Sequence, residues 1–388
     1  MKFDKPVYIV AARRSPIGRF GGGLATVPAR DLALQVAEAT VDDSLRPSVD
    51  HVILGQVLSA GTGMNIARQI ALRLGLPQET PGFTVNMVCG SGLKAVVLGA
   101  QQILMGESEL VLTGGVESMS NAPHYCTQAR FGNKLGNGTL LDGILTDGLT
   151  DPILSVSMGE TAENIAEKFR ITRAEQDEFA ALSQVRAAKS VAHFVREIAP
   201  ILTVKGSVSS DEQPRPDSSF ETLGKLRPAF MRDGTVTAGN ASTINDGAAM
   251  LVLASEAACT RNKVHPRVVV RGSTVTGCDP ALMGLGPVGA IRQLCTELKW
   301  SLENVDAVEI NEAFAVQTIA CARELGIPLE KLNQRGGAIA LGHPIGASGA
   351  RVLVTLLHLM EDRDYKRGIA SLCVGGGMGI AVAIELVG

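Results

Sequence analysis

The chain is short of aromatic residues and contains no paired cysteine motif. One Trp and three Tyr accompany ten Phe among 388 residues, and none of the seven cysteines lies in a Cys-X-X-Cys pair. An odd number of such cysteines argues against a disulfide framework and against a zinc site. The histidines show no ligand spacing either. We therefore expect no metal, no redox cofactor and a reducing, cytoplasmic location.

Long apolar runs and an excess of positive charge are also missing. No stretch reaches the roughly 20 apolar residues of a membrane-spanning helix, and the apolar run near the N-terminus is too short for a signal peptide. The 36 Lys and Arg residues are scattered along the chain, and the net charge is −3. We therefore expect neither a membrane nor a nucleic acid as a partner.

Glycine, in contrast, is abundant, with 43 residues, and 45% of the chain is hydrophobic. This length exceeds that of one ordinary domain, so two or three units are expected. Short β-branched runs alternate with Ala-rich stretches of helical spacing, which is typical of α/β proteins. Residues 7–12 and 51–58 are predicted strands, and residues 29–45 between them are a predicted helix.

The alternation of helix and strand occurs twice. A helix predicted at 91–105 precedes a strand at 109–119, and a helix predicted at 349–362 precedes two strands within 367–387. The strand from Glu109 has no neighbouring partner, and a matching apolar run appears only at 248–255. The sequence therefore predicts two similar α/β halves, the first formed by residues 1–119 with 247–264 and the second by residues 265–388.

Residues 120–246 form a predicted insertion in the first half. This segment is polar, with a helical pattern over 161–194 and a composition at 205–219 that favours disorder. It is either a surface excursion or a loop domain that lines a ligand site. An insertion beside a strand end favours the second interpretation.

Four short motifs hold residues that are able to carry chemistry. Cys89 precedes a predicted helix, where the helix dipole and free N–H groups lower a thiol pKa and hold an oxyanion. His343 lies in a Gly- and Pro-rich turn, where an imidazole can act as a general base. Cys373 ends a strand before a run of glycines, and Asn311 ends another strand. For each residue alone, a buried, capping or solvated structural role is the alternative.

One further motif is weak. Residues 284–289 fit the Gly-X-Gly-X-X-Gly pattern of dinucleotide sites, but they follow no predicted strand and include Pro287. We do not expect a dinucleotide site there.

Taken together, the Cys-Gly-Ser, Asn-Glu-Ala-Phe, Gly-His-Pro and Cys-Val-Gly motifs at 89, 311, 342 and 373 resemble the four catalytic loops of the thiolase family. The resemblance extends over essentially the whole chain. It implies two βαβαβαββ halves in a five-layered αβαβα arrangement with an inserted, CoA-binding loop domain. It also implies an acyltransferase that acts on acyl-CoA and CoA, with coenzyme A as substrate or product.

The resemblance further implies residue roles. Cys89 carries the acyl group, with His343 as its base, while Cys373 removes a proton from the second substrate. His343 and a water held by Asn311 stabilise the resulting enolate oxygen, and the N–H groups of Cys89 and Gly375 hold the oxyanion. The CoA contacts that it implies are Leu149, Met158, Arg215, Thr222, Phe230, Ala238, Ser242, Met283, Ala313 and Phe314.

The resemblance is strongest to enzymes that condense two acetyl-CoA into acetoacetyl-CoA. A degradative 3-ketoacyl-CoA thiolase of broader chain length is the main alternative, since Ser157 replaces the histidine that is usual in the biosynthetic enzymes. A β-ketoacyl synthase lacks the second reactive cysteine, and a catalytically silent CoA-binding scaffold is the alternative of another class. The segment 122–138 resembles a tetramer-forming loop, so we expect a homo-oligomer, a dimer of dimers.

Overall fold

The computed structural model describes residues 1–388, and one hydrogen-bonded sheet of ten strands runs through the molecule. Its strand order is β14-β15-β16-β13-β1-β12-β5-β3-β4, and the short β2 pairs with β12. The strands are β1 Lys2–Arg14, β2 Gly18–Arg19, β3 His51–Gly55, β4 Gly82–Val85, β5 Leu110–Ser118, β12 Asn245–Ala254, β13 Val268–Gly277, β14 Ala307–Ile310, β15 Arg367–Val374 and β16 Met378–Leu386. Because β1 pairs with both β12 and β13, it joins two half-sheets.

The two half-sheets repeat one strand arrangement. The first runs β1-β12-β5-β3-β4 and the second β13-β16-β15-β14, where Leu332 bridges Val308 in the place of a further strand. In the first half, β12 pairs antiparallel with β1 and with β5, and β5, β3 and β4 are parallel to one another. In the second half, β16 pairs antiparallel with β13 and with β15 in the same way, and β15 and β14 are parallel. The predicted repeat of two α/β halves is confirmed.

The predicted partner of β5 is also confirmed. β5 and β12 pair antiparallel along their whole length, from Ser118 opposite Asp246 to Leu110 opposite Ala254. Both strands are fully buried. The insertion therefore leaves the first half after one central strand and returns at the start of the next.

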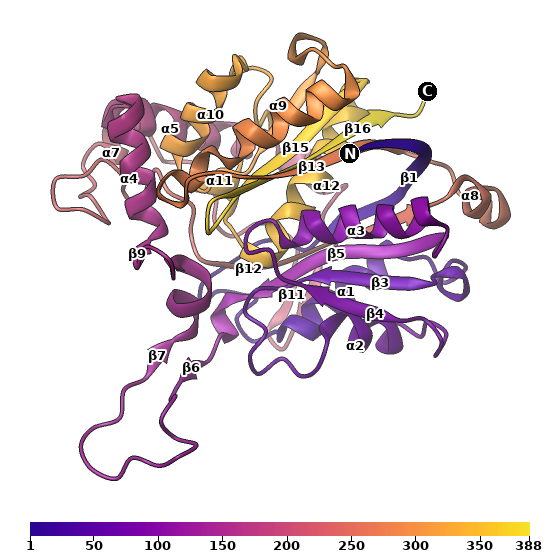
Figure 1. Cartoon of the computed structure of the whole chain (residues 1–388), viewed down its shortest axis with the longest axis horizontal. Helices are drawn as coiled ribbons and strands as arrows, with labels where there is room; N and C mark the ends of the chain where they lie inside the picture. The colour runs from indigo at the N-terminus through magenta and orange to yellow at the C-terminus, as the bar shows by residue number, and fades with distance from the viewer.

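Helices and half-sheets alternate in five layers, seen from bottom to top in Figure 1. The outer helices are α1 Ala29–Thr40 and α2 Ile66–Arg73 on one side and α9 Gly286–Leu298 and α10 Ala315–Leu325 on the other; the middle helices are α3 Ser91–Met105 and α12 Ile345–Arg363. One buried cluster joins α3 and α12 to both half-sheets, and two more lie beneath the outer helices. Apolar burial on both sides of each half-sheet holds these layers together.

The two middle helices touch through glycine. A Cβ on Gly349 would lie 2.4 Å from the backbone nitrogen of Leu93, and one on Gly92 would lie 2.8 Å from that of Ala350. The backbones are thus too close for any side chain at these points. This contact brings the N-terminal ends of α3 and α12 together.

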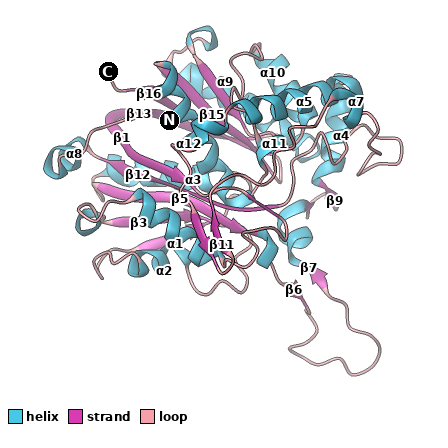
Figure 2. Cartoon of the chain, turned by 180° about the vertical axis from the view of Figure 1, so that it is seen from behind, coloured by secondary structure: helices cyan, strands magenta, loops and turns pink.

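The insertion forms a lobe beside the layers, and its hairpin between β6 and β7 extends away from the body (Figures 1 and 2). Its elements are β6 His124–Tyr125, β7 Leu141–Asp142, a π-helical turn Leu145–Leu149, β8 Thr150–Asp151, β9 Val156–Ser157, α4 Met158–Phe169, α5 Arg173–Lys189, α6 Val191–Phe194, β10 Ile201–Thr203, β11 Gly206–Val208 and α7 Phe220–Leu223. The remaining helices are α8 Glu256–Asn262 and α11 Ala338–Leu341, with short 3-10 turns at Arg46–Ser48, Met119–Asn121, Pro280–Leu285 and Leu302–Asn304.

One expectation for the insertion is confirmed with a break in it, and another is wrong. The helical pattern over 161–194 is not one helix, because Arg170 adopts a left-handed conformation and Thr172 starts α5 with a capping box. The stretch 205–219 is ordered. Asp211 pairs with the buried Arg14, and Glu212 accepts hydrogen bonds from the backbone of Gly23. Long-range ion pairing compensates for the scarcity of apolar residues there.

One segment of the chain comes closer to the length and hydropathy of a membrane-spanning helix than expected from the sequence. Residues Val88–Met105 are apolar enough by length and composition, and 56% of the segment is buried inside the fold. The position of α3 in the middle layer accounts for this composition, because a helix covered on all sides is apolar all round.

Candidate active site

Cys89 lies on a strained turn at the start of α3. Val88 has a φ of +44°, a left-handed conformation that costs a β-branched residue about 1–2 kcal/mol. Asn86 Oδ1 accepts a hydrogen bond from the Val88 N–H at 2.9 Å. Ser91 Oγ accepts from the Met87 N–H at 2.8 Å and donates to the Val88 carbonyl at 2.6 Å. These contacts hold the turn and fix the position of the Cys89 backbone.

The environment of Cys89 favours the thiol over the thiolate. Cys89 keeps some exposed surface, but its sulfur is surrounded by protein. Burial raises the pKa of the thiol to about 11, although hydrogen bonds from the backbone N–H groups of Gly375 and of Cys89 itself lower it. The predicted low pKa of a helix-start cysteine is wrong for the free protein, because desolvation outweighs these donors.

His343 is held in one tautomer. The Ser348 hydroxyl donates its only hydrogen to the Pro344 carbonyl at 2.9 Å, so it accepts a hydrogen bond from His343 Nδ1 at 2.6 Å. Nδ1 therefore carries the proton, and Nε2 keeps its lone pair. Burial, with a smaller contribution from the charge of Arg351, lowers the pKa of His343 to about 3. The imidazole is thus neutral in the free protein, and the Nε2 lone pair is available to accept a proton.

Asn311 faces this basic nitrogen from the second half of the chain. It follows β14, and its side-chain Nδ2 lies 3.5 Å from His343 Nε2. Its Oδ1 is buried and has no hydrogen-bond partner in the protein. A buried acceptor without a partner is costly, so this oxygen suits a ligand or an ordered water. The structure thus places the side chains of Asn311 and His343 in contact.

Cys373 and Gly375 complete the cluster at the turn between β15 and β16. Cys373 is 1% exposed and pairs with Gly379. Burial raises the pKa of its thiol well above the ordinary value, and the neighbouring Cys89 thiol raises it further. A Cβ on Gly375 would lie 3.4 Å from the Val88 side chain and 3.6 Å from Met158 Sδ. The structure therefore groups Cys89 with Cys373 and Gly375 and groups Asn311 with His343. The Asn311 N–H donates to the carbonyl of Ser371 at 3.0 Å, two positions before Cys373 on β15, which links the two groups.

Residues of the insertion and of the second half form one wall beside the cluster. The rings of Phe230 and Phe314 meet edge to face, with centroids 6.0 Å apart, and the Ser242 N–H donates to the Ala313 carbonyl at 2.9 Å. Met158 and the buried Met283 pack against the same apolar cluster as Cys373. Six of the ten predicted CoA contacts therefore lie together: Met158, Phe230, Ser242, Met283, Ala313 and Phe314.

The other four predicted CoA contacts are more scattered. Leu149 packs on a small apolar cluster that Cys89 also contacts. Arg215 is exposed and its side chain makes no hydrogen bond or ion pair, Ala238 is also exposed, and Thr222 caps α7 with Ser219. Leu149 thus lies near the nucleophile, whereas no contact joins Arg215, Thr222 or Ala238 to the catalytic cluster.

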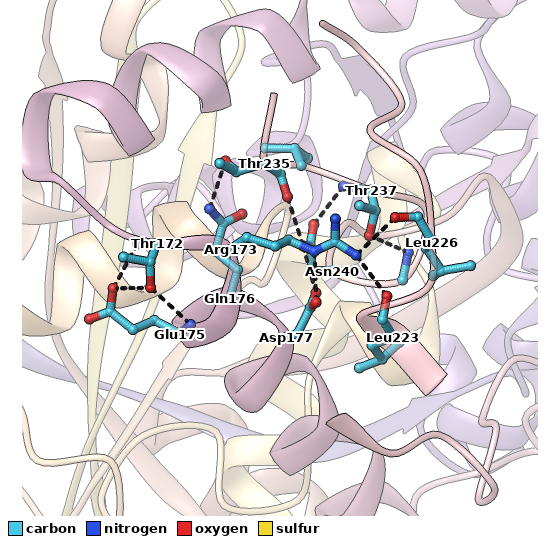
Figure 3. Close-up of polar contacts among 12 residues, drawn as sticks. Thr172, Arg173, Glu175, Gln176, Asp177, Leu223, Leu226, Thr235, Thr237 and Asn240 are labelled. Atoms are coloured by element: carbon cyan, nitrogen blue, oxygen red, sulfur yellow. Dashed lines mark hydrogen bonds and ion pairs between the residues drawn. The ribbon is translucent and has the colours of Figure 1, made fainter. Parts of the chain in front are cut away.

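A polar network anchors the loop that carries several of these residues (Figure 3). Arg173 Nη2 donates to the Leu223 carbonyl at 2.7 Å, and its Nε donates to Asp177 at 2.7 Å. Asn240 Nδ2 donates to Asp177 at 2.9 Å and to the Thr235 carbonyl at 3.1 Å. The start of α5 thus fixes both ends of the segment 223–240, which includes Phe230.

Ser157 has a structural task. Its hydroxyl accepts a hydrogen bond from the Glu160 N–H, and the Glu160 carboxylate accepts one from the Ser157 N–H, which makes a capping box at the start of α4. A serine is a better N-cap than most residues. The cap places Met158 at the first position of the helix, pointing toward Gly375.

Three supporting residues escape prediction from the sequence. Ser348 fixes the His343 tautomer, and Asn245 Oδ1 accepts a hydrogen bond from the His343 N–H at 3.0 Å. Glu117 accepts from the N–H groups of Val57, Leu58 and Gly346, and burial raises the pKa of Glu117 to about 7. Only Ser348 has a local signal, since it lies in the first turns of the helix that follows His343.

Two sizeable surface hollows do not coincide with the catalytic cluster. One of about 710 Å³ lies between α5 and α10, and one of about 660 Å³ lies along α4 and residues 231–235. Neither is lined by a predicted catalytic residue. The chemistry of the cluster, and not either of these hollows, identifies the site.

Comparisons with known proteins agree along the whole chain. Residues 7–257 match the family model "Thiolase, N-terminal domain", and residues 264–386 match "Thiolase, C-terminal domain". An acetyl-CoA acetyltransferase of Chromobacterium violaceum is 51% identical over 98% of this chain and 99% of its own. The crystal structure of the Bacillus anthracis acetyl-CoA acetyltransferase matches with a TM-score of 0.95 and 44% identity, covering 100% of both chains. Human mitochondrial 3-ketoacyl-CoA thiolase in complex with CoA matches with a TM-score of 0.97 and 43% identity, over 100% of this chain and 99% of that one.

Proposed function

This chain belongs to the thiolase family of acyltransferases, and from that premise we propose that it condenses two acetyl-CoA into acetoacetyl-CoA and CoA, reversibly, through an acetyl-Cys89 intermediate. The observation that carries the proposal is the neutral His343, whose Nε2 lone pair faces Asn311 while Ser348 holds the Nδ1 proton. A buried, neutral imidazole of fixed tautomer is suited to take the proton of a nucleophilic thiol in covalent acyl transfer.

In the first half-reaction, His343 Nε2 takes the Cys89 proton while the sulfur attacks the thioester carbonyl. The N–H groups of Cys89 and Gly375 hold the resulting oxyanion, since the Gly375 N–H already bonds the Cys89 sulfur. An oxyanion donor is typically worth about 3–4 kcal/mol. The CoA thiolate leaves with the Cys373 proton, so the acetyl-enzyme holds a Cys373 thiolate and a His343 imidazolium of opposite charge.

In the second half-reaction, the Cys373 thiolate removes a methyl proton from another acetyl-CoA. The His343 Nε2–H and a water on Asn311 Oδ1 donate to the enolate oxygen. The enolate carbon attacks the acetyl thioester on Cys89, and the departing Cys89 thiolate regains its proton from His343. Cys89 regains its own proton, whereas Cys373 gives its proton to the departing CoA and replaces it with one from the methyl group. In the net reaction, the acetyl group therefore takes the place of one methyl hydrogen, and one proton ends on the released CoA thiol.

Labelled acetyl-CoA tests these roles. After incubation and peptide mapping, the label is expected on Cys89 in the unmodified protein and in Cys373→Ala. The Cys373→Ala protein is expected to lose exchange of the acetyl-CoA methyl protons with deuterium oxide by about 10²–10⁴-fold. Cys321→Ala is the matched control, because Cys321 is another buried cysteine beside Cys373, and it should keep both activities. Label on Cys373, or normal exchange in Cys373→Ala, refutes the assignment.

A degradative 3-ketoacyl-CoA thiolase is the second candidate, favoured by the match to the human mitochondrial enzyme. The wall residues argue for short chains. Met283 is 4% exposed within a packed cluster, and the Phe230 ring covers Gly159, where a Cβ would lie 2.1 Å from it. Ser157 leaves no extra room by itself, because its hydroxyl is committed to the α4 cap.

Relative kcat/KM for a series of 3-ketoacyl-CoA substrates decides between the two candidates. A closed pocket rejects longer chains through overpacking, at roughly 1–3 kcal/mol, so we expect acetoacetyl-CoA to be the best substrate. An open pocket gains up to about 0.8 kcal/mol, or about fourfold, for each buried methylene. Cleavage of long-chain substrates at equal or higher kcat/KM establishes the degradative function.

A further inference from the structure

A small cavity of about 180 Å³ is lined by none of the predicted catalytic residues and is rich in positive charge. It lies between the C-terminal end of α5, the start of α6, the turn at 334–335 and the last turn of α12. Five of its eight lining residues are cationic or can become so: Arg186, Lys189, His193, Arg335 and Arg363. No acidic residue lines the cavity. The first requirement of an anion site, a surplus of donors, is therefore met.

The carboxylates next to the cavity are already paired with cationic side chains. Asp362 accepts from Arg335 and Arg196 and lies 3.1 Å from His193 Nδ1. The neighbouring Glu361 is paired with Arg267. Burial alone would raise the pKa of Asp362, but the hydrogen bond and charge of Arg335, with the charge of Arg196, outweigh it and lower that pKa. The carboxylate thus stays ionised and still leaves the region positive.

Two cations and one buried donor lack a partner. Lys189 and Arg363 are exposed and have no carboxylate within ion-pair distance. The Arg335 side chain is only 4% exposed, and its Nη1 has no hydrogen-bond partner. Leaving a buried charged donor unpaired is expensive. The C-terminal carbonyls of α5 and α12 bring partial negative charge to the cavity, but they do not satisfy this Nη1.

We propose that this cavity is a binding site for a small phosphate-bearing anion, recognised by Arg335, Lys189 and Arg363. A guanidinium fork matches phosphate oxygens, and a lysine adds a mobile charge. The volume admits a phosphate group or a small phosphate monoester and excludes a whole nucleotide. The site is separate from the thiolase chemistry, and its ligand binds in the absence of turnover.

The site adjoins the segment that leads to His343. Arg335 stands eight positions before His343 and next to Gly336, which has a φ of +78° and packs on the α5 backbone. A ligand bridging Arg335 to α5 and α12 therefore stiffens the segment that leads to His343.

Calorimetric titration of the whole protein with inorganic phosphate, at constant ionic strength, tests the proposal. We expect saturable millimolar binding that weakens at least tenfold in Lys189→Gln/Arg363→Gln. Both positions are exposed, so the fold is kept. Lys168→Gln/Lys205→Gln, which removes the same charge from exposed sites elsewhere, should bind phosphate like the unmodified protein.

Three outcomes overturn the proposal: no saturable binding, equal weakening in the two double variants, or displacement of phosphate by CoA. The last outcome assigns the phosphate to the CoA site. A second titration with glycerol 3-phosphate identifies the source of the phosphate group. Tighter binding than that of inorganic phosphate indicates a small phosphorylated metabolite, and weaker binding indicates free phosphate. Because neither titration requires turnover, failure of the proposed acetyltransferase activity leaves their outcome unaffected.

Discussion

At the scale of single residues, the tautomer of His343 depends on one hydroxyl. The Ser348 hydroxyl accepts a hydrogen bond from His343 Nδ1–H, because its own hydrogen is donated to the Pro344 carbonyl. In Ser348→Ala, Nδ1 loses its acceptor, and the imidazole is free to turn or to carry its proton on Nε2. We expect kcat to fall by about 10–100-fold with little change in KM, measured as cleavage of acetoacetyl-CoA.

Thr355→Ala is the matched control for Ser348→Ala. It removes another fully buried hydroxyl from the same helix, where Thr355 Oγ1 contacts Glu197 at 3.2 Å. This variant should be destabilised to a similar extent and should keep its activity within a few-fold. If both variants lose activity equally, the role of Ser348 is only to pack α12.

The pKa of Cys89 predicts how the free enzyme reacts with alkylating agents. Burial raises that pKa to about 11, so the thiolate fraction rises tenfold with each pH unit up to that value. The rate of Cys89 alkylation by iodoacetamide should therefore climb without a plateau between about pH 7 and pH 9. A plateau from neutral pH onward would instead indicate a preformed thiolate–imidazolium pair. Peptide mapping separates Cys89 from the exposed Cys126.

The sequence identifies the reacting groups but not their surroundings. Cys89, His343, Asn311 and Cys373 each stand out through local glycine, proline or strand-end context. Asn245, by contrast, reaches His343 from 98 positions away, a contact that no local pattern encodes. The low pKa expected for Cys89 was wrong for the same reason, because the burial that raises this pKa arises only when the layers of the fold pack together.

At the scale of secondary-structure elements, the contact between α3 and α12 has no spare room. A Cβ on Gly349 would lie 2.4 Å from a backbone atom of Leu93, which cannot rotate away. We expect Gly349→Ala to reduce stability by about 1–3 kcal/mol and to lower activity, because the helices carry Cys89 and His343 at their starts. Thermal and denaturant unfolding measure the first effect.

Gly289→Ala, in helix α9, is expected not to reduce stability, in contrast to Gly349→Ala. Gly289 is exposed on α9, and its Cβ would meet only the end of the Thr276 side chain at 3.1 Å. Alanine there gains helix propensity of about 0.5–1 kcal/mol, so stability should rise or stay the same. Equal losses at both glycines would show that the close approach of α3 and α12 is not what makes Gly349 necessary.

Periodicity predicts the elements of the layers better than those of the insertion. The strands and helices of the two halves are long, apolar and repeated, so each pattern supports the other. The break between α4 and α5 was visible as Thr172 followed three positions later by Glu175, a signal that the continuous helical pattern masked. The order of residues 205–219 depends on Arg14 and was not visible.

At the scale of the whole molecule, the hairpin loop between β6 and β7 exposes apolar side chains. Phe131, Leu135 and Leu140 are 86%, 94% and 65% exposed. Exposed apolar side chains gathered on one extension indicate a contact with another chain. We expect light scattering to give a mass about four times that of the 40.6 kDa chain, with closed symmetry.

Phe131→Ser/Leu135→Ser tests the hairpin directly. It should shift the assembly toward a dimer while each subunit keeps its fold, because both side chains point into solvent within one chain. Val195→Ser/Val204→Ser, which also removes two exposed apolar side chains, should leave the mass unchanged. A monomer of the unmodified protein at micromolar concentration contradicts the assembly as a whole, and a dimer contradicts only the role of the hairpin.

Because the insertion separates β5 from its partner strand β12 in the sequence, the ribosome makes the two strands at different times. β5 ends at Ser118 and its partner β12 begins at Asn245, so a ribosome adding about 5–20 residues per second makes the second strand roughly 6–25 s after the first. Through that interval the apolar edge of β5 is complete, unpaired and able to pair with another nascent chain. Slower translation of the insertion, by rare codons or by low temperature, lengthens this exposure, so the yield of native protein should fall unless a chaperone covers the strand.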